Sequence, residues 1–410
     1  MANIIERWNL IKLENLLDFY IGGDWGEQEP INSNYIETKV LRATDISNWE
    51  NDHGENAQIR YLKDTSLAKR QLKENDLIIE VSGGSPDQPV GRTIIMSSDD
   101  IQKFQYPVTC SNFFRLLRFN NKINPKFINY YFKFLYETKI IESYQSNSTN
   151  LRNLKFSQFL NQNIPVPQTL CEQQEIVDVL DAASEIIRLR TACIESAQSL
   201  IPALFQEMFG DMSKNTNSYE LFKIKNLGKV TTGSTPSSKK ENMFGGDIPF
   251  ITPADLESGQ DEYGRYVTQE GAKNSRIVRA GSTLVCCIGA TIGKVDKAIV
   301  DSCFNQQINA IEWNEGINDI FGLYLFRQIA PLIRNKASHT TLPILNKGNF
   351  ENIIIPKPQK PKQDLFAEKA QEIEAYIKTQ QVELENAKTM FQSLLHHSFT
   401  GELTRRAYGE

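Results

Sequence analysis

The feature that most constrains this chain is an apolar pattern that occurs twice, first near residue 176 and again about 190 positions later. In both copies the apolar residues recur at alternating steps of four and three, which keeps one side of an α-helix against a partner helix. A polar residue takes the same slot in each copy, and a buried polar slot tends to fix the register of paired helices. The predicted contact positions are Ile176, Leu180, Ile187, Arg190, Ile194, Ile201 and Leu204 in the first copy and Phe366, Ile373, Ile377, Gln380, Leu384, Phe391 and Leu394 in the second.

Two unrelated amphipathic helices would also produce such patterns, but the flanking sequences repeat as well. Ile251–Leu256 mirrors Leu41–Ile46, Cys303 mirrors Cys110, and Gly233 falls where Gly22 does. A Pro-x-Pro break precedes each helix, at Pro165 and Pro167 and at Pro356 and Pro358. We therefore predict that a whole β-plus-helix module followed by a long helix has been duplicated.

The predicted fold class is α+β, with two β-rich domains in tandem joined by two long antiparallel coiled-coil helices. The first domain is expected over residues 1–168, the first long helix over 169–212, the second domain over 213–362, and the second long helix with a tail over 363–410. Within the first domain, Pro125–Ser143 is predicted to be helical, with an aromatic face that belongs to the core rather than to a base-stacking surface. Pro202 is expected to kink the first long helix or to end it early.

Composition places the chain among ordinary globular proteins. It has 410 residues, 40% hydrophobic and 23% charged, and a net charge of −5. No apolar run approaches the roughly 18 to 20 residues that span a bilayer, and the first residues lack a basic leader and an apolar signal core. Six cysteines without a Cys-x-x-Cys pair or a His-Cys cluster predict a reducing cytoplasm and no metal site.

The charge is unevenly distributed along the chain. Residues 112–165 and residues 322–362 are strongly basic, whereas the first long helix is acidic. Two basic patches, one in each half, are compatible with binding to a phosphate backbone, although a charge run is also typical of a solvated face.

No catalytic signature is present. Gly289–Lys294 resembles a phosphate loop, but it is one residue short and Val295 stands where Ser or Thr would bind magnesium. The chain lacks the Asp/Asn-Pro-Pro-Tyr/Phe tetrapeptide of amino-methyltransferases and a Gly-x-Gly-x-x-Gly loop. Two similar modules with divergent loops indicate recognition rather than chemistry.

Taken together, the chain resembles the specificity subunit of Type I restriction–modification systems over essentially its whole length. The resemblance rests on the module order, the Pro-x-Pro breaks, Gln173-Gln174 at the start of the first helix, and Phe399-Thr400-Gly401-Glu402-Leu403 near the end of the second. The turn Thr232-Gly233-Ser234-Thr235-Pro236 is also typical of that family, and its first copy, Ile21-Gly22-Gly23-Asp24-Trp25, departs from the pattern.

The resemblance implies two target-recognition domains, each reading one half of a split site in double-stranded DNA, held apart by the helix pair. About 38 helical residues at roughly 1.5 Å each span on the order of 57 Å, and one turn of duplex DNA is about 34 to 36 Å. The implied partners are two adenine-methylating modification subunits and two ATP-driven restriction subunits. S-adenosylmethionine, ATP and magnesium would be held by those subunits, and no cofactor is expected on this chain, which would be non-catalytic.

Within the two domains, loop and turn residues are the candidates for DNA contacts. Candidate phosphate contacts are Arg92, Arg152, Lys155, Lys294, Arg334 and Lys336, and candidate base-edge contacts are Ser146, Asn147, Asn150, Ser338, His339 and Thr341. Side chains of these types can read groove edges or bind the backbone.

Two other hypotheses remain: a DNA methyltransferase or nuclease in its own right, which would need a cofactor loop, and a coiled-coil scaffold without DNA binding.

Overall fold

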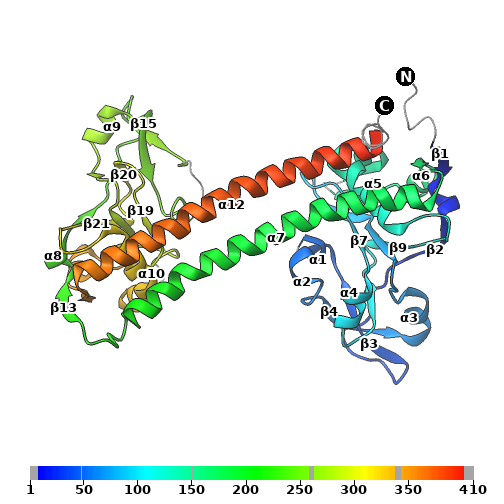
Figure 1. Ribbon diagram of the computed structural model, residues 1–410, viewed down its shortest axis with the longest axis horizontal. Coiled ribbons are helices and arrows are strands. Elements are labelled where there is room, and N and C mark those ends of the chain that lie inside the picture. The colour runs from blue at the N-terminus through cyan, green and yellow to red at the C-terminus, as the bar shows by residue number, and fades with distance from the viewer. Residues whose placement is uncertain (1–7, 48, 149–150, 258–262, 338–342, 401–410) are drawn as a thin grey trace. The chain divides into compact units, whose positions relative to one another are not determined.

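The computed structural model describes residues 8–47, 49–148, 151–257, 263–337 and 343–400. The chain divides into two compact units (Figure 1), unit 1 with Met1–Thr191 and Glu383–Glu410 and unit 2 with Ala192–Val382. Both divisions fall inside a long helix, so each long helix contributes one part to each unit.

The two long helices are α7, Leu170–Phe209, and α12, Lys360–Thr400. Helix α7 begins with a capping arrangement, because the Glu172 backbone N–H donates to Thr169 Oγ1 and the Thr169 N–H donates to the Glu172 carboxylate. Of the two outcomes expected at Pro202, the early end is wrong, since α7 continues to Phe209, and the kink stays a prediction. Pro202 removes one backbone donor, but the turns around it are held by the buried side chains of Ile201 and Phe205.

Unit 1 consists mainly of short strands with short helices between some of them. The strands are β1 Asn9–Lys12, β2 Leu17–Gly22, β3 Tyr35–Leu41, β4 Gln58–Lys63, β5 Leu77–Glu80, β6 Ser82–Gly84, β7 Thr93–Ile95, β8 Val108–Cys110, β9 Phe114–Phe119, β10 Gln145–Ser148, β11 Leu151–Leu154 and β12 Asn163–Val166. The helices are η2 Leu13–Leu16, α1 Ala43–Ser47, α2 Trp49–Asp52, α3 Asp64–Arg70, α4 Ser98–Lys103, α5 Pro125–Glu137, η3 Ile140–Tyr144 and α6 Phe156–Leu160.

Unit 2 has the same plan with fewer helices among its described residues. Its strands are β13 Glu220–Lys223, β14 Gly228–Thr232, β15 Phe244–Ile251, β16 Tyr266–Val267, β17 Ile277–Val278, β18 Thr283–Cys286, β19 Val295–Lys297, β20 Ser302–Phe304, β21 Ile308–Trp313 and β22 Ile354–Lys357. Its helices are α8 Ile224–Leu227, α9 Gln269–Lys273, α10 Asp319–Lys336 and α11 Lys347–Glu351.

The sheets show that the two units are copies of one module. An antiparallel sheet has the order β2-β9-β5-β7 in unit 1 and β14-β21-β18-β19 in unit 2. A second sheet contains a parallel pair in each unit, β3 with β8 and β15 with β20. The first and last strands of each module also pair, β1 with β12 and β13 with β22. The tandem α+β architecture predicted from the repeat is thus confirmed.

The structure corrects the alignment of the two copies by one residue at two places. The backbone N–H of Gly23 donates to Phe114 O, and that of Gly233 donates to Ile308 O. A Cβ on either glycine would lie 2.1 Å from a carbonyl oxygen of the facing turn, so both positions require glycine. Gly233 therefore corresponds to Gly23 rather than Gly22, and by the same register Phe304, not Cys303, corresponds to Cys110.

The helix expected over Pro125–Ser143 is shorter than predicted. Helix α5 ends at Glu137, because Lys139 adopts a left-handed conformation (φ 60°) and a separate 3-10 helix follows. The aromatic face of α5 is part of the core, as predicted, and its buried members are Phe127, Tyr130, Tyr131, Phe134 and Leu135.

A glutamine near the start of each long helix binds the residue that caps another helix of its unit, α5 in unit 1 and α10 in unit 2. Gln173 Oε1 accepts from the backbone N–H of Asn124, the residue that caps α5, at 2.8 Å. In unit 2 Gln363 Oε1 accepts from the N–H of Asn318, which caps α10, at 2.9 Å. Both glutamine side chains are buried, so the Gln173 of the sequence motif has a structural role.

Within each unit, part of α7 packs against part of α12 and against one further helix, α5 in unit 1 and α10 in unit 2. In unit 1 the beginning of α7 and the end of α12 share one apolar cluster, where Phe399 lies 5.3 Å from Phe127 between ring centroids. In unit 2 the end of α7 and the beginning of α12 meet in the same way, with Phe205 and Phe366 at 5.1 Å. The two helices therefore run antiparallel (Figure 1), as predicted.

The predicted helix contact positions are all at least half-buried. Ile176, Leu180, Ile194, Ile201, Phe366 and Phe391 are buried, and Ile187, Arg190, Leu204, Ile373, Ile377, Gln380, Leu384 and Leu394 are half-buried. The polar slot of α7 forms an ion pair in unit 1, from Arg190 Nη2 to Glu383 Oε2 at 3.3 Å.

Among the described residues, no helix has the length and apolar character needed to cross a bilayer.

Candidate nucleic-acid interface

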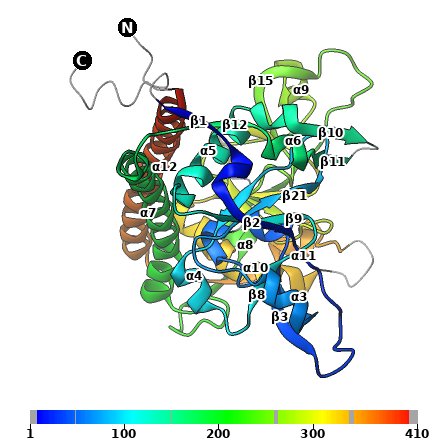
Figure 2. The ribbon, with the colours of Figure 1, turned by 90° about the vertical axis from the view of Figure 1, so that its right-hand side faces the viewer.

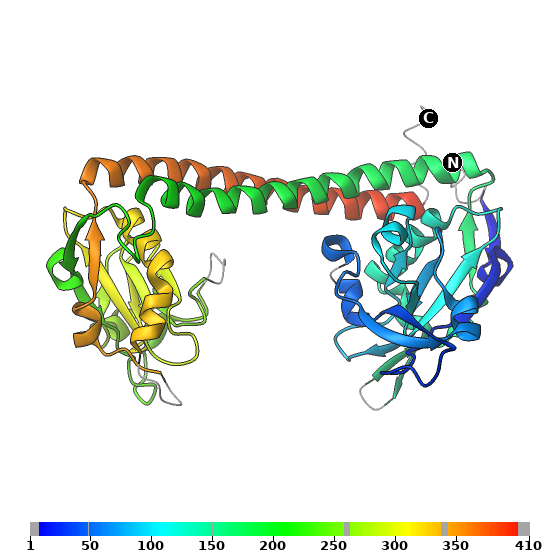
Figure 3. The same ribbon diagram turned by 90° about the horizontal axis from the view of Figure 1, so that it is seen from below.

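The unit 1 candidates gather on a small sheet formed by β10, β11 and β6. Ser146 and Asn147 lie on β10, and Arg152 lies on β11 opposite both Asn147 and Gly84 of β6. This hairpin is on the side of unit 1 turned away from α7 and α12 (Figures 2 and 3). The structure thus brings together Ser146, Arg152 and the glycine-rich segment that follows β5. The side chain of Asn147, and Asn150 as a whole, are outside the described residues.

The two unit 1 cations next to this hairpin differ in availability. Arg152 donates through Nη1 to Glu142 Oε2 at 2.8 Å and through Nη2 to Pro86 O at 2.5 Å, and its side chain is 17% exposed. Lys155 precedes α6, is exposed, and has no carboxylate partner within the described part of the chain. Ser146 donates weakly to Asn153 O at 3.4 Å. Lys155 is therefore the unit 1 candidate with its charge most open to a phosphate.

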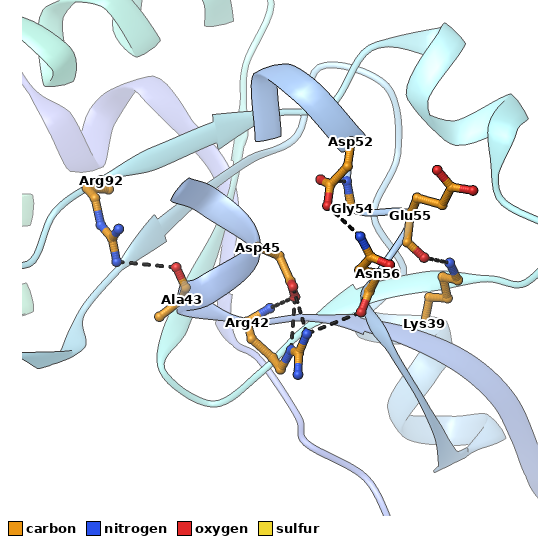
Figure 4. A network of polar contacts seen from close by, with 9 residues as sticks. All are labelled: Lys39, Arg42, Ala43, Asp45, Asp52, Gly54, Glu55, Asn56 and Arg92. Carbon is orange, nitrogen blue, oxygen red and sulfur yellow. Dashed lines mark hydrogen bonds and ion pairs between the residues drawn. The ribbon is translucent and has the colours of Figure 1, made fainter. Parts of the chain in front are cut away.

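Arg92 and Lys294 occupy equivalent positions, and both connect parts of their own unit. The N–H of Glu80 donates to Arg92 O, and the N–H of Cys286 donates to Lys294 O, each at 2.9 Å. Arg92 forms a bidentate pair with the Glu80 carboxylate at 2.8 and 2.9 Å. It also donates to Ala43 O, and Figure 4 shows this contact. The hydrogen bonds that the Arg92 guanidinium donates to the Glu80 carboxylate raise the pKa of Arg92. Lys294 Nζ donates to Leu256 O at 3.1 Å.

Arg92 and Lys294 each connect the central sheet of their unit to the turn or helix that follows the parallel strand. In unit 1 the guanidinium of Arg92 joins the central sheet to α1, the helix that follows β3, and in unit 2 the ammonium of Lys294 reaches the equivalent turn. Both phosphate assignments stay predictions, but each group would have to share or give up a hydrogen bond within its own unit to bind a phosphate, and the Arg92 charge is already paired with the Glu80 carboxylate.

The remaining unit 2 candidates lie at the end of α10. Arg334 Nε donates to Ile292 O at 3.2 Å, and its aliphatic part lies over Gly293, where a Cβ would come within 2.9 Å of it. Lys336 is exposed in the last turn of the helix. Ser338, His339 and Thr341 are outside the described residues. The resemblance of Gly289–Lys294 to a phosphate loop has a structural explanation, because the segment is a tight turn whose Gly289 N–H donates to Pro343 O.

The basic patches counted on the sequence are partly neutralised in the structure. Arg118 is paired with the buried carboxylate of Asp76, and Lys126 with Asp181. In the second patch Arg327, Lys347 and Lys360 each have a carboxylate partner. The usable positive charge is thus smaller than the count of basic residues indicates.

Sequence reasoning did not select Arg115, which lies 5.7 Å from the Phe156 ring and has no carboxylate partner among the described residues.

Other chemistry finds no support in the described part of the chain. It contains no group of three or more His, Cys, Asp or Glu side chains placed to hold a metal ion. Burial raises the pKa of the Cys110 and Cys287 thiols to about 12, so neither is a thiolate at neutral pH.

The comparison with known families gives a match in each half of the chain. The family described as Type I restriction modification DNA specificity domain matches residues 5–197 and again residues 217–387. These two segments correspond to the two copies of the duplicated module.

Curated relatives carry the same description. The chain is similar to the MjaIX specificity subunit of Methanocaldococcus jannaschii (31% identity over 165 residues, 38% of each chain). It is also similar to the HindI specificity subunit of Haemophilus influenzae (28% over 177 residues, 42% of this chain and 38% of that one). The StySPI specificity subunit of Salmonella potsdam aligns at 20% over 427 residues, 97% of this chain and 90% of that one. The chain spans 38% of the length of the first two relatives.

Two solved structures share the fold. One is a Type I restriction–modification S subunit from M. genitalium, with 15% identity, a TM-score of 0.56 and 96% of both chains covered. The other belongs to work on complex assembly and conformational transition of a type I system, with 17% identity, a TM-score of 0.61, and 96% and 98% covered. At these identities the likeness shows the fold alone.

Proposed function

Because the chain belongs to the family of Type I restriction–modification DNA specificity domains, we propose that it is the DNA sequence-recognition subunit of such a system. The observation that carries this proposal is the duplication itself: each unit repeats one module, and each copy matches the specificity domain. Two copies with different loops are suited to a bipartite site with two different half-sites. Each domain would read one half-site by direct contacts to base edges and hold it by contacts to phosphates.

The partners and the catalysis follow from this role. The chain would direct adenine methylation by two modification subunits, which supply S-adenosylmethionine, and cleavage by two ATP- and magnesium-dependent restriction subunits. It would bind no cofactor and catalyse no reaction itself. One of the related structures concerns the assembly of a type I complex, which supports a multi-subunit partner arrangement for this chain.

Deleting the gene in its source cell is expected to abolish adenine methylation at one split motif. The motif should consist of two short blocks around a fixed unread gap, as genome-wide methylation mapping would show. Exchanging residues 1–168 for those of a related subunit should change one block and leave the other. An unchanged methylation map, with the partner subunits shown to be expressed, would contradict the proposal.

Substituting Lys155 with glutamine is expected to weaken DNA binding to all sequences alike. Removing one phosphate contact should reduce the slope of log K against log salt by about 0.9, measured by fluorescence anisotropy of the assembled complex at several salt concentrations. Lys388→Gln is the matched control, because Lys388 lies on α12, is not a candidate DNA contact, and has its ammonium paired with the Glu385 carboxylate at 2.8 Å. Equal slopes for Lys155→Gln and the wild type would remove Lys155 from the interface.

A further inference from the structure

A turn rich in amide side chains joins β20 to β21 in unit 2. It consists of Asn305, Gln306 and Gln307. The turn is rigid, since the N–H of Asn305 donates to Ile251 O and the N–H of Cys287 donates to Gln307 O. Within it the Gln307 N–H donates to Asn305 Oδ1, and Asn305 Nδ2 donates to Gln307 Oε1, each at 3.0 Å. The two outer amides thus hold each other, and the middle one is presented to solvent.

The Thr232–Pro236 turn supports the exposed amide. Gly233 lies directly against Asn305 O, at a distance that excludes any side chain. The Thr235 hydroxyl donates to Gln306 Oε1 at 2.7 Å. This bond orients the Gln306 amide, and its Nε2 group has no partner among the described residues. An oriented amide with free donors on a rigid turn is prepared for a ligand outside the protein.

A groove of about 600 Å³ begins at the same threonine. Arg265 is exposed in it and has no carboxylate partner in the described part of the chain, and the groove's described lining contains no carboxylate. Its side-chain lining combines a cation, three hydroxyls and two aromatic rings, from Thr235, Ser238, Phe244, Arg265 and Tyr266, with Pro236. A cation with hydroxyl groups suits a sugar–phosphate backbone.

Unit 1 is built differently at the equivalent place. The register that aligns Gly23 with Gly233 places Trp25 where unit 2 has Thr235, and Asn112 where it has Gln306. The Trp25 ring is stacked against the Arg60 guanidinium at 4.8 Å, and Arg60 Nε donates to Trp25 O. The threonine that orients the amide is therefore specific to unit 2.

From these observations, and resting on the proposed function, we propose that Gln306 reads a base edge in the half-site bound by unit 2, with Thr235 as its positioning residue. The groove beside it takes the adjoining sugar–phosphate backbone. A glutamine amide pairs in bidentate fashion with the N6 amino group and N7 of adenine in the major groove. The base at this position of the half-site is therefore an adenine.

The test uses the full-length chain co-expressed with its modification subunits, and genome-wide mapping of methylated adenines. Gln306→Ala should relax the motif at one adenine position, in the block that exchange of residues 1–168 leaves unchanged. One bidentate contact corresponds to a loss of discrimination of roughly 5- to 150-fold. Thr235→Val should relax the same position, and Thr235→Ser, which keeps the hydroxyl, should restore it. Gln381→Ala, an exposed amide of α12, is the matched control and should leave the motif intact.

The outcomes separate this inference from the proposed function. If Gln306→Ala lowers methylation of all sites equally, or relaxes a position that is not adenine, Gln306 does not read adenine and the inference fails while the proposed function stands. If the motif is unchanged, the inference fails in the same way. If the wild-type chain directs no split-motif methylation, the proposed function fails and the inference falls with it.

Discussion

Replacing Phe205 with alanine is expected to lower the free energy of unfolding of unit 2 by about 3 to 5 kcal/mol. Phe205 is 2% exposed, and its ring lies 5.0 Å from Phe209, 5.6 Å from Phe321 and 5.1 Å from Phe366. These rings come from α7, α10 and α12, so the substitution opens a cavity where three helices of the unit meet. Such a cavity cannot collapse without moving one of the helices.

Hydrogen exchange resolved by segment would measure this effect, because the chain has two units and a single melting temperature would not describe it. Protection should fall in α10 and in the part of α12 that belongs to unit 2. Leu200→Ala on the same helix is the control, since Leu200 is 54% exposed and surface substitutions usually change stability by less than about 0.5 kcal/mol. Equal losses for Phe205→Ala and Leu200→Ala would show that this aromatic cluster does not stabilise the unit.

The long helices and the duplication could be predicted because both leave periodic signals in the sequence. Steps of four and three persist through each helix, and the strand segments recur in the same order. The sequence did not predict that α7 would turn Phe205 and Phe209 toward α10, because the apolar pattern shows that a face is buried and not what buries it. The early end expected at Pro202 was wrong for a related reason: the penalty for proline is local, whereas the packing that offsets it is tertiary.

The register of the repeat and the charged surface were harder to predict. Gly22 and Gly23 are adjacent, and only the close approach of a carbonyl oxygen distinguishes the one that must be glycine. The basic patches were overestimated because the neutralising carboxylates are distant in sequence, as Asp76 is from Arg118. The amide run at Gln306 was visible in the sequence, but its significance depends on Thr235, which lies 71 positions away.

Replacing Arg92 with methionine is expected to destabilise unit 1 by about 3 to 5 kcal/mol, because it leaves the Glu80 carboxylate buried without its partner. The Glu80 side chain is 1% exposed, and the guanidinium satisfies both of its oxygens. The double variant Glu80→Met with Arg92→Met should recover most of this loss, since an apolar pair of similar volume often matches a buried ion pair. Unit 2 supports this expectation, because the buried residue equivalent to Glu80 is the uncharged Cys286.

The same double variant decides whether Arg92 also contacts DNA. A structural role predicts that the variant, once its stability is restored, binds DNA with the affinity and salt dependence of the wild type. A phosphate contact predicts weaker binding to every sequence and a slope smaller by about 0.9. Hydrogen exchange of the segments of unit 1 and salt-dependent binding, both measured on the single and double variants, give both quantities on the same proteins. The pairing with Glu80 and the contact to Ala43 lead us to expect the first result, since a guanidinium held on both sides by its own protein gains little by turning to a phosphate.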